Sequence, residues 1–400
     1  MADRLVYLDH SATTPVDPRV IDAMLPHWTD DWGNPNSLYE LGRRAYRSLE
    51  EARERFMAGI NAKHPAEVIF TGAGTESDNA ALLGIAGALR DRKKGSHLIV
   101  SAYEHHAVLR TAEYLAKHGY DVTFVKPRTD GEIHAEDLAA AVRDDTILVS
   151  VMHGNNEIGT INDLKRLAQV AHERGALFHT DAVQTLGKIP FDVEELGIDA
   201  AAFSAHKLYG PKGVGAMYLR KGTPFTPLIL GGGQEFKRRS GTQNVAGAHG
   251  LATALELMIA DMGEEAARLT DLRDKTIAGV FDRIPNVDLN AKNAARKLPQ
   301  LANFIIKGVE GEAMLLQLDN KGIAVSTGSA CSSGSLEPSH VLLSIGCPPE
   351  LAHGSLRVSF GRMNTEADVE YFLDVFPPIV ERLRSMSPVY DRMFGSGASA

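Results

Sequence analysis

Residues 70–87, FTGAGTESDNAALLGIAG, contain the end of a strand, a glycine-containing turn and the start of a helix. The N-terminus of a helix offers unpaired backbone N–H groups and the positive end of a dipole. A phosphate group binds well at such a position, and Thr75 adds a hydroxyl group. The glycine spacing fits neither a Walker loop nor a dinucleotide-binding fingerprint. Phosphate binding is therefore one interpretation, and an ordinary helix capped by Thr75 is the other.

The same strand-and-helix pattern recurs through the first part of the chain. Such alternation predicts a mostly parallel sheet covered by helices on both faces. The predicted strands are 67–71, 97–102, 121–126, 146–152, 176–180, 200–204 and 214–219, and helices are predicted at 75–92, 107–118, 135–143 and 162–174. A parallel crossover needs about a dozen residues or more, so the short link before 214–219 predicts that this strand is antiparallel.

The pattern changes beyond about residue 250. One long helix (246–283) is predicted there, and the strands and helices that follow no longer alternate strictly. This order is typical of a smaller α+β domain. The sequence thus predicts a large domain over 17–259 and a small domain formed by 1–16 and 260–394. The tail GSGASA, 395–400, is of low complexity and is predicted to be disordered.

Composition narrows the class of protein. The chain has 400 residues and a formal net charge of -9, which argues against nucleic acid and anionic membranes as partners. No apolar run approaches the ~18 residues of a membrane span, and the N-terminus carries charges where a signal peptide is apolar. The two cysteines, Cys331 and Cys347, exclude a disulfide framework. A soluble cytoplasmic protein with reduced thiols is expected.

Polar motifs follow several predicted strands, where an open α/β sheet binds its ligands. In SAHKLYGPKG (204–213), Lys207 is a candidate for a Schiff base, although a lysine in a loop is often only solvated. Ser204 and His206 could reach the same phosphate. In FHTDAVQT (178–185), Asp181 could pair with a protonated pyridine nitrogen or cap a helix.

Further candidates surround these. Gln184, three residues after Asp181, could donate to a ligand oxygen. In EHHAV (104–108), His105 could stack on a flat ring or move protons near neutral pH. NNEIGT (155–160) could recognise a polar ligand or form a turn. In SLRVSFGR (355–362), strand alternation separates Arg357 from its apolar neighbours, so that it could hold a carboxylate.

One thiol has unusual neighbours. Cys331 lies in VSTGSACSSGSLEPSHV (325–341), among glycines and serines that cannot bury it. Structural cysteines are usually buried, whereas Gly/Ser-rich segments are flexible tethers. The pattern predicts a mobile loop, about 324–337, that carries a nucleophile. Cys347 has no motif around it and is expected to be a small apolar filler or a surface thiol.

Together these features are what pyridoxal phosphate requires. The sequence resembles the cysteine desulfurases of the NifS and IscS branch, in the class V aminotransferase group of fold-type I pyridoxal-phosphate enzymes. The motifs that carry the resemblance cover nearly the whole chain: YLDHSATTPVD, GNPNSLY, TESDN, NNEIGT, HTDAVQ, SAHKLYGPKG, SGTQN and STGSACSSGSLEPSHV. One departure, DHSATT in place of the commoner DNNATT, places His10 near the site without an assigned role.

The resemblance implies a fold, a reaction and a set of roles. The fold would be a seven-stranded, mostly parallel sheet domain with a smaller α+β domain, assembled as a homodimer. L-cysteine would become L-alanine, with sulfur held as a persulfide on Cys331 and passed to an iron–sulfur scaffold of the NifU or IscU type or to another acceptor. Lys207 would bind the cofactor covalently, and His105 would stack on the ring and accept a proton. The other implied residues are Asp181 at the ring nitrogen; Gln184 at the ring oxygen; Gly74, Thr75, Ser204 and His206 at the phosphate, with Thr242 from the other subunit; and Asn34, Asn156 and Arg357 at the substrate.

Three alternatives remain open. A class V aminotransferase has no need of a thiol on a flexible loop, so Cys331 argues against that reaction. Selenocysteine lyase activity requires a comparison of substrates. A non-catalytic binding protein with the same fold is disfavoured, because both Lys207 and Cys331 are present. No metal-binding motif is recognised.

Overall fold

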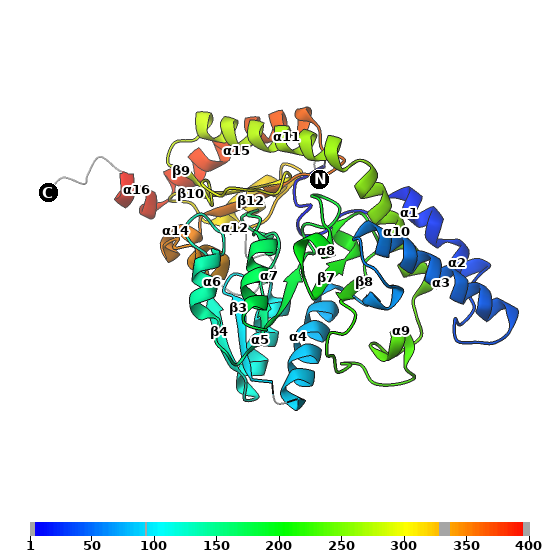
Figure 1. The fold of residues 1–400 in the computed structure, drawn as a ribbon. Coiled ribbons are helices and arrows are strands. Elements are labelled where there is room, and N and C mark those ends of the chain that lie inside the picture. The colour runs from blue at the N-terminus through cyan, green and yellow to red at the C-terminus, as the bar shows by residue number, and fades with distance from the viewer. Residues whose placement is uncertain (1–4, 93, 328–336, 395–400) are drawn as a thin grey trace.

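The computed structural model describes residues 5–92, 94–327 and 337–394 (Figure 1). Its centre is a seven-stranded sheet in the order β2-β8-β7-β6-β5-β3-β4. The strands are β2 (Val68–Thr71), β3 (His97–Ser101), β4 (Asp121–Val125), β5 (Thr146–Ser150), β6 (Leu177–Asp181), β7 (Ala200–Ser204) and β8 (Gly215–Leu219). Each predicted strand is thus confirmed to within about two residues at either end.

The sheet is parallel except at one side. Strands β3 to β7 pair in parallel, whereas β8 is antiparallel to both β7 and β2. The prediction for 214–219 is therefore confirmed, and its physical reason holds: the turn from β7 to β8 is too short for a crossover. The parallel strands carry their C-terminal ends to one edge of the sheet.

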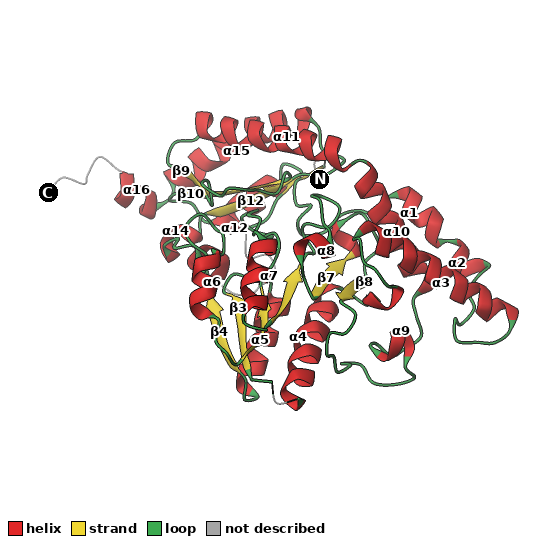
Figure 2. Cartoon of the chain, viewed as in Figure 1, coloured by secondary structure: helices red, strands yellow, loops and turns green. Residues whose placement is uncertain are grey.

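Helices cover both faces of this sheet (Figure 2). On one face, α4 (Gly74–Asp91) and α5 (His106–Lys117) bury residues such as Leu82 and Val108 against the strands. The opposite face carries a larger apolar core, to which α3 (Glu40–Gly59), α7 (Leu164–Glu173) and α10 (Val245–Ala260) contribute. The remaining helices of this part are α1 (Pro18–Met24), α2 (Pro26–Thr29), α6 (Ala135–Ala141), α8 (Val193–Leu196) and α9 (Gln234–Lys237).

A separate core lies under the C-terminal elements. Strands β9 (Val287–Leu289), β10 (Leu301–Ile306) and β12 (Ser355–Ser359) form an antiparallel sheet, and β1 (Val6–Tyr7) pairs in parallel with β11 (Ile323–Ala324). Helices α11 (Met262–Arg283) and α15 (Glu366–Ser385) lie side by side over this sheet (Figure 1). The other helices are α12 (Gly311–Asp319), α13 (His340–Ser344), α14 (Pro349–Ala352) and α16 (Pro388–Phe394). Val6 and Leu8 belong to the same core, in agreement with the grouping of 1–16 with the small domain, although the domain boundaries stay a prediction.

One predicted element is wrong. Residues 246–283 form two helices, because α10 ends at Ala260 and α11 begins at Met262. Arg362 explains the break: its guanidinium binds the Leu257 carbonyl at 2.8 Å and the Asp261 carboxylate at 3.1 Å. This contact stabilises the C-terminus of α10, where cations are favourable. Arg362 thus has a structural role.

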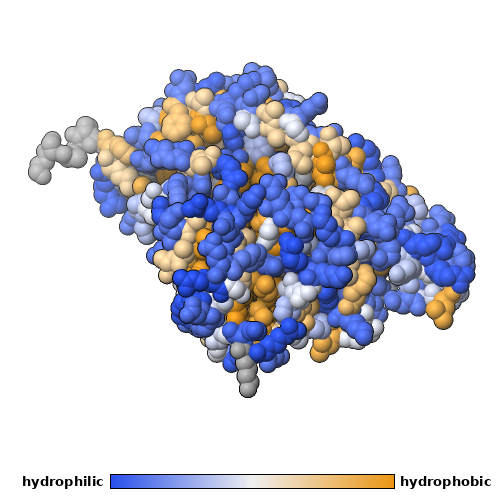
Figure 3. Space-filling model, viewed as in Figure 1, coloured by the Kyte–Doolittle hydropathy of each residue, from blue (hydrophilic) through white to orange (hydrophobic). Residues whose placement is uncertain are grey.

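The outer surface is polar for the most part. On the face seen in Figure 3, hydrophilic residues dominate and apolar residues show between them. Within the described ranges, no helix combines the length and the apolar character needed to cross a bilayer. Both the predicted disordered tail, 395–400, and the predicted loop around Cys331, from 328 to 336, lie outside the described residues.

Candidate active site

A cavity of about 320 Å³ lies at the C-terminal ends of β6 and β7, where an α/β sheet binds its ligands. Ten of the predicted residues line it: Gly74, Thr75, His105, Asn156, Asp181, Gln184, Ser204, His206, Lys207 and Arg357. These residues come from six separate motifs, and the fold alone brings them together. The volume suits a small-molecule ligand.

Lys207 ends a short 3-10 turn (Ala205–Lys207) that directly follows β7. Its Nζ donates hydrogen bonds to the carbonyl oxygens of Ser11 at 2.6 Å and Ala12 at 2.7 Å. The lysine is thus held at the cavity wall by backbone from the N-terminal segment. It is not merely a solvated loop residue.

The start of α4 forms another wall. The helix begins at Gly74, and its N-cap, Ala73, has no side-chain capping bond. Thr75 is the second residue of the helix, so the alternative in which Thr75 is the cap is wrong. A Cβ atom at Gly74 would lie 2.8 Å from Val183 Cγ2 and 3.2 Å from Ser204 Cβ, so only glycine fits there. The helix N-terminus is therefore open to an anion.

Two carboxyl groups are buried in the cavity wall. Asp181, the last residue of β6, accepts a hydrogen bond from the Val183 N–H at 2.8 Å. Burial raises the pKa of Asp181 to about 6, and the charge of Lys207 opposes this shift. Asp78 lies one turn into α4, and burial and the charge of Asp181 raise its pKa well above the usual range. Burial thus favours the neutral form of Asp78, whereas Asp181 is mostly ionised at pH 7.

Two imidazoles stand near Lys207. His105 caps α5, with Nδ1 accepting a hydrogen bond from the Ala107 N–H at 3.1 Å. Burial lowers the pKa of His105 to about 4, assisted by the charge of Lys207. The same causes, burial first, lower the pKa of His206 to about 4, and its Nδ1 lies 3.1 Å from Thr13 Oγ1. Both rings are therefore neutral at physiological pH, as stacking on a flat ring allows.

The substrate side of the cavity is formed by Arg357 and Asn156. Arg357 lies in β12, and its Nη1 donates to the Asn156 carbonyl at 2.8 Å while Nη2 pairs with Asp9 Oδ1 at 2.7 Å. Of its donors, Nε has no hydrogen-bond partner within the described part of the chain, and the same holds for Asn156 Oδ1. The alternation argument is confirmed, because Arg357 faces the cavity. A carboxylate could bind at this edge.

Two predicted residues lie elsewhere. Asn34 and Thr242 are on exposed loops and do not line this cavity; a hydrogen bond of 3.0 Å from Asn36 to Gln243 joins the two loops. Cys331 lies outside the described residues. Cys347 is half-buried against the main core, and burial raises the pKa of its thiol, as expected for a filler residue.

Sequence reasoning missed several contributors. Ser11 and Ala12 act through their backbone carbonyl oxygens, and these cannot be recognised from the type of residue because every residue has one. Asp78 could have been found, because it follows Thr75 by three residues and so lies near it on the helix.

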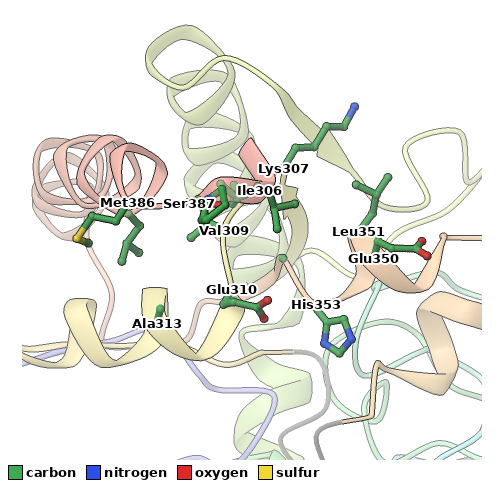
Figure 4. A pocket seen from close by; sticks show the side chains of 15 residues that line it. Ile306, Lys307, Val309, Glu310, Ala313, Glu350, Leu351, His353, Met386 and Ser387 are labelled. Carbon is green, nitrogen blue, oxygen red and sulfur yellow. The ribbon is translucent and has the colours of Figure 1, made fainter. Parts of the chain in front are cut away.

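A second hollow, of about 350 Å³, lies between β10, α14 and the C-terminal helices (Figure 4). Lys307, Glu310, Glu350 and His353 line it, but none of the predicted site residues does.

The cavity lined by Lys207 and Asp181 fits pyridoxal phosphate. Buried polar atoms without a hydrogen-bond partner among the described residues line it, namely Ser11 Oγ, Asp78 Oδ1, Asn156 Oδ1 and Arg357 Nε. Such atoms are costly to bury unless a ligand satisfies them. The described residues contain no group of three or more His, Cys, Asp or Glu that could hold a metal ion.

Comparisons with known proteins agree with this geometry. The family model described as "Aminotransferase class-V" matches residues 6–372. "Cysteine desulfurase IscS" of Clostridium botulinum is 48% identical over 390 residues, 97% of this chain and 98% of its own. The protein of the same name from Dictyoglomus turgidum is 51% identical over 385 residues, 96% of this chain and 97% of its own.

Solved structures give the same result. A structure titled "NIFS-LIKE PROTEIN" superposes with a TM-score of 0.88 at 38% identity, covering 95% of this chain and 100% of that one. A NifS-like protein from Rickettsia africae gives a TM-score of 0.85 at 29% identity, with 94% and 100% covered. The chain therefore belongs to the class V aminotransferase family and, within it, to the pyridoxal-phosphate-dependent cysteine desulfurases of the NifS and IscS branch.

Proposed function

We propose that this protein converts L-cysteine to L-alanine and captures the sulfur on Cys331. The observation that carries the proposal is the position of Lys207, which lines the same cavity as Asp181 and the open N-terminus of α4. A lysine, a carboxylate and an anion site in one cavity match the three ends of pyridoxal phosphate. Full-length similarity to proteins named cysteine desulfurase supports the choice of substrate.

The cofactor site uses the residues of the cavity wall. The phosphate would bind at Gly74 and Thr75, with Ser204 and His206 beside them, and the ring nitrogen would face Asp181. Gln184 would meet the ring oxygen, and the neutral ring of His105 would stack on the cofactor. When bound, pyridoxal phosphate withdraws electrons from the α-carbon of an attached amino acid.

The chain's own residues supply binding and proton transfer. Arg357 and Asn156 would hold the carboxylate of cysteine, with Asn34 also assigned to the substrate. Lys207 Nζ would take the α-proton and later return a proton to carbon. His105 is a weak base at a pKa of about 4, so we assign it to stacking first and to proton acceptance second.

Sulfur transfer requires a nucleophile. The Cys331 sulfur, as thiolate, forms a bond to the substrate sulfur while the bond between that sulfur and the β-carbon breaks. The β-carbon then takes up a proton, and alanine leaves. The persulfide on Cys331 is passed to an iron–sulfur scaffold protein or to another sulfur acceptor, in a cytoplasm that keeps thiols reduced.

A homodimer is part of the proposal. Large apolar side chains are exposed on α2 and on the segment that leads into α3: Trp28, Trp32, Leu38 and Tyr39, which are 57%, 65%, 89% and 62% exposed. The hydrogen bond from Asn36 to Gln243 ties this segment to the loop that carries Thr242. An exposed apolar surface of this kind is typical of an interface. A second copy would cover it and bring Thr242 to the partner's phosphate.

The test is cysteine turnover with the protein loaded with pyridoxal phosphate. The wild-type protein is expected to release alanine, and to carry a persulfide on Cys331 that mass spectrometry detects. Cys331→Ala should keep the visible absorbance of the cofactor and lose sulfur transfer, whereas Cys347→Ala, the matched control, should behave as wild type. Sulfur release at the normal rate by Cys331→Ala would show that the assigned nucleophile is wrong.

A further inference from the structure

Lys188 is a second lysine beside the cavity that the proposed reaction leaves unused. It lies four residues after Gln184, in a run of helical turns in which the Ile189 N–H bonds to the Thr185 carbonyl at 3.2 Å. Residues four apart in such a turn face the same side. Gly187 makes the arrangement possible, because its φ is +72° and a Cβ there would lie 2.7 Å from Met258 Cβ.

The side-chain amide of Gln184 joins two lysines. Lys188 Nζ donates to Gln184 Oε1 at 3.5 Å, and Gln184 Nε2 donates to the Ser11 carbonyl at 2.9 Å. The same Ser11 carbonyl accepts from Lys207 Nζ at 2.6 Å. A continuous network therefore runs from Lys188 through Gln184 and Ser11 to the lysine that binds the cofactor.

This network determines which way the amide points. An ammonium group can only donate, so it requires the oxygen of Gln184; a carbonyl can only accept, so it requires the nitrogen. Lys188 and Ser11 thus select the same orientation from opposite ends. Gln184 Nε2 has two hydrogens, and the one that Ser11 does not take remains for a ligand oxygen in the cavity.

The charged neighbours of Lys188 do not compete with Gln184 as hydrogen-bond acceptors. Lys188 is half-buried, and its neighbours of electrostatic importance are basic, namely His10, His206 and Lys207. Burial, assisted by the charge of Lys207, lowers the pKa of Lys188 to about 7, so the ammonium form that must donate to Gln184 is favoured at and below that pH, where the test is made. Within the described ranges it makes no ion pair with a carboxylate. The Gln184 oxygen is therefore its hydrogen-bond partner on the cavity side.

We propose that Lys188 is a positioning residue that fixes the orientation of the Gln184 amide, so that this amide presents an N–H to the ring oxygen of the cofactor. The inference rests on the proposed role of Gln184 at the cofactor. It assigns to Lys188 no contact with substrate and no proton transfer.

The test is a double-mutant cycle in the protein loaded with pyridoxal phosphate, with Lys188→Met, Gln184→Ala and the double variant. Two quantities are measured: the visible absorption maximum of the bound cofactor, and kcat and KM for L-cysteine. Lys188→Met should shift the absorption maximum and lower kcat/KM by about tenfold, as the loss of one charge-assisted hydrogen bond predicts. In the Gln184→Ala background the same change should have less than about a twofold effect, because coupled residues are not additive.

Two further variants separate positioning from general damage. Lys188→Arg keeps a charged donor and should restore the wild-type spectrum. Lys165→Met, the same change at an exposed lysine of α7, should leave spectrum and turnover unchanged. If Lys188→Met does not accumulate, Lys188→Gln, which keeps a neutral donor, should show a smaller spectral shift in the same direction.

Two results would overturn the inference. One is a Lys188→Met protein with the spectrum and kinetics of wild type; the other is an effect of Lys188→Met that is equally large without Gln184. The spectrum needs only bound cofactor. A wild-type protein that makes no alanine would therefore refute the proposed reaction, while a coupled spectral shift would still support the role of Lys188.

Discussion

A buried ion pair, Arg53 with Glu235, holds the segment that leads to Thr242. The Arg53 side chain is 2% exposed, and its Nη1 and Nη2 donate to the Glu235 carboxylate at 2.7 and 2.9 Å. Glu235 Oε2 also accepts from the Phe70 N–H at 2.9 Å, which ties the segment to β2. The backbone of Glu235, Phe236 and Lys237 is left-handed, with φ of 46°, 56° and 64°, a conformation that costs energy in residues other than glycine.

Replacing Glu235 by Gln removes one of the two carboxylates that pair with Arg53 and keeps the shape, whereas Glu50 Oε1 stays 3.1 Å from Arg53 Nε. Breaking one side of a buried ion pair costs about 3–5 kcal/mol, and because Glu50 still offsets part of the Arg53 charge, we expect the lower end, about 3 kcal/mol. For a chain of this length the entropy of unfolding is about 0.8 kcal/mol/K near 60 °C, so Tm should fall by about 4 °C. The left-handed turn adds to the effect, since nothing of equal strength would hold it.

Thermal unfolding of the cofactor-free protein, followed by calorimetry, measures this change. Glu195→Gln is the matched control, because Glu195 pairs with Lys165 at 3.6 Å and the two side chains are 69% and 65% exposed. That variant should shift Tm by less than about 1 °C. A Tm for Glu235→Gln within 1 °C of wild type would refute the reasoning that the buried pair holds this segment.

Three further predictions concern the cavity. Lys207→Ala should lower alanine formation by about 10²–10⁴-fold, because proton transfer at the α-carbon loses its base; retention of a tenth of the wild-type rate, measured by amino-acid analysis, would contradict that role. Arg357→Lys should raise KM for cysteine about tenfold or more in steady-state kinetics, because an ammonium group cannot replace a bidentate fork; an unchanged KM would place the substrate carboxylate elsewhere. Asp181→Asn should stabilise the cofactor-free protein at pH 7 by about 3 kcal/mol in denaturant unfolding. The folded pKa of Asp181, about 6, lies above the unfolded value, so wild-type stability falls as pH rises between about 4 and 6, and the advantage of the variant should disappear below about pH 4; an advantage that persists at pH 3 would exclude this cause.

Much of the fold could be predicted from the sequence, because buried parallel strands are apolar runs of ordinary length. The break between α10 and α11 could not, since its cause is Arg362, about a hundred residues further along the chain. Likewise, the helical pattern at the start of α4 indicates a helix but not its first residue. The alternative in which Thr75 is the cap differs from the observed cap, Ala73, by two residues, and this difference decides whether the N-terminus is open or closed to an anion.

The candidate site, like the fold, could be predicted from the sequence only in part. The side chains of the predicted residues can be recognised in the sequence by their type and by their position near strand ends. Ten of these predicted residues line one cavity. Carbonyl oxygens such as those of Ser11 and Ala12 carry no such signal, because every residue has one. Asn34 and Thr242, on exposed loops, stay predictions, since their roles depend on a second copy of the chain.

The electrostatics of the cavity explain why a ligand with separated charges fits it. Burial raises the pKa values of acids and lowers those of imidazoles, so the neutral form of Asp78 is favoured, and His105 and His206 are neutral at pH 7. Asp181 is mostly ionised and lies on one side, and the open end of α4 attracts an anion on the other. A ligand that is cationic at one end and anionic at the other therefore gains at both ends, whereas a simple anion meets the carboxylate of Asp181 and a simple cation meets the helix N-terminus. The cavity thus favours the charge pattern of a protonated pyridine phosphate, because burial keeps its imidazoles neutral while Asp181 and the N-terminus of α4 keep opposite charges on its two sides.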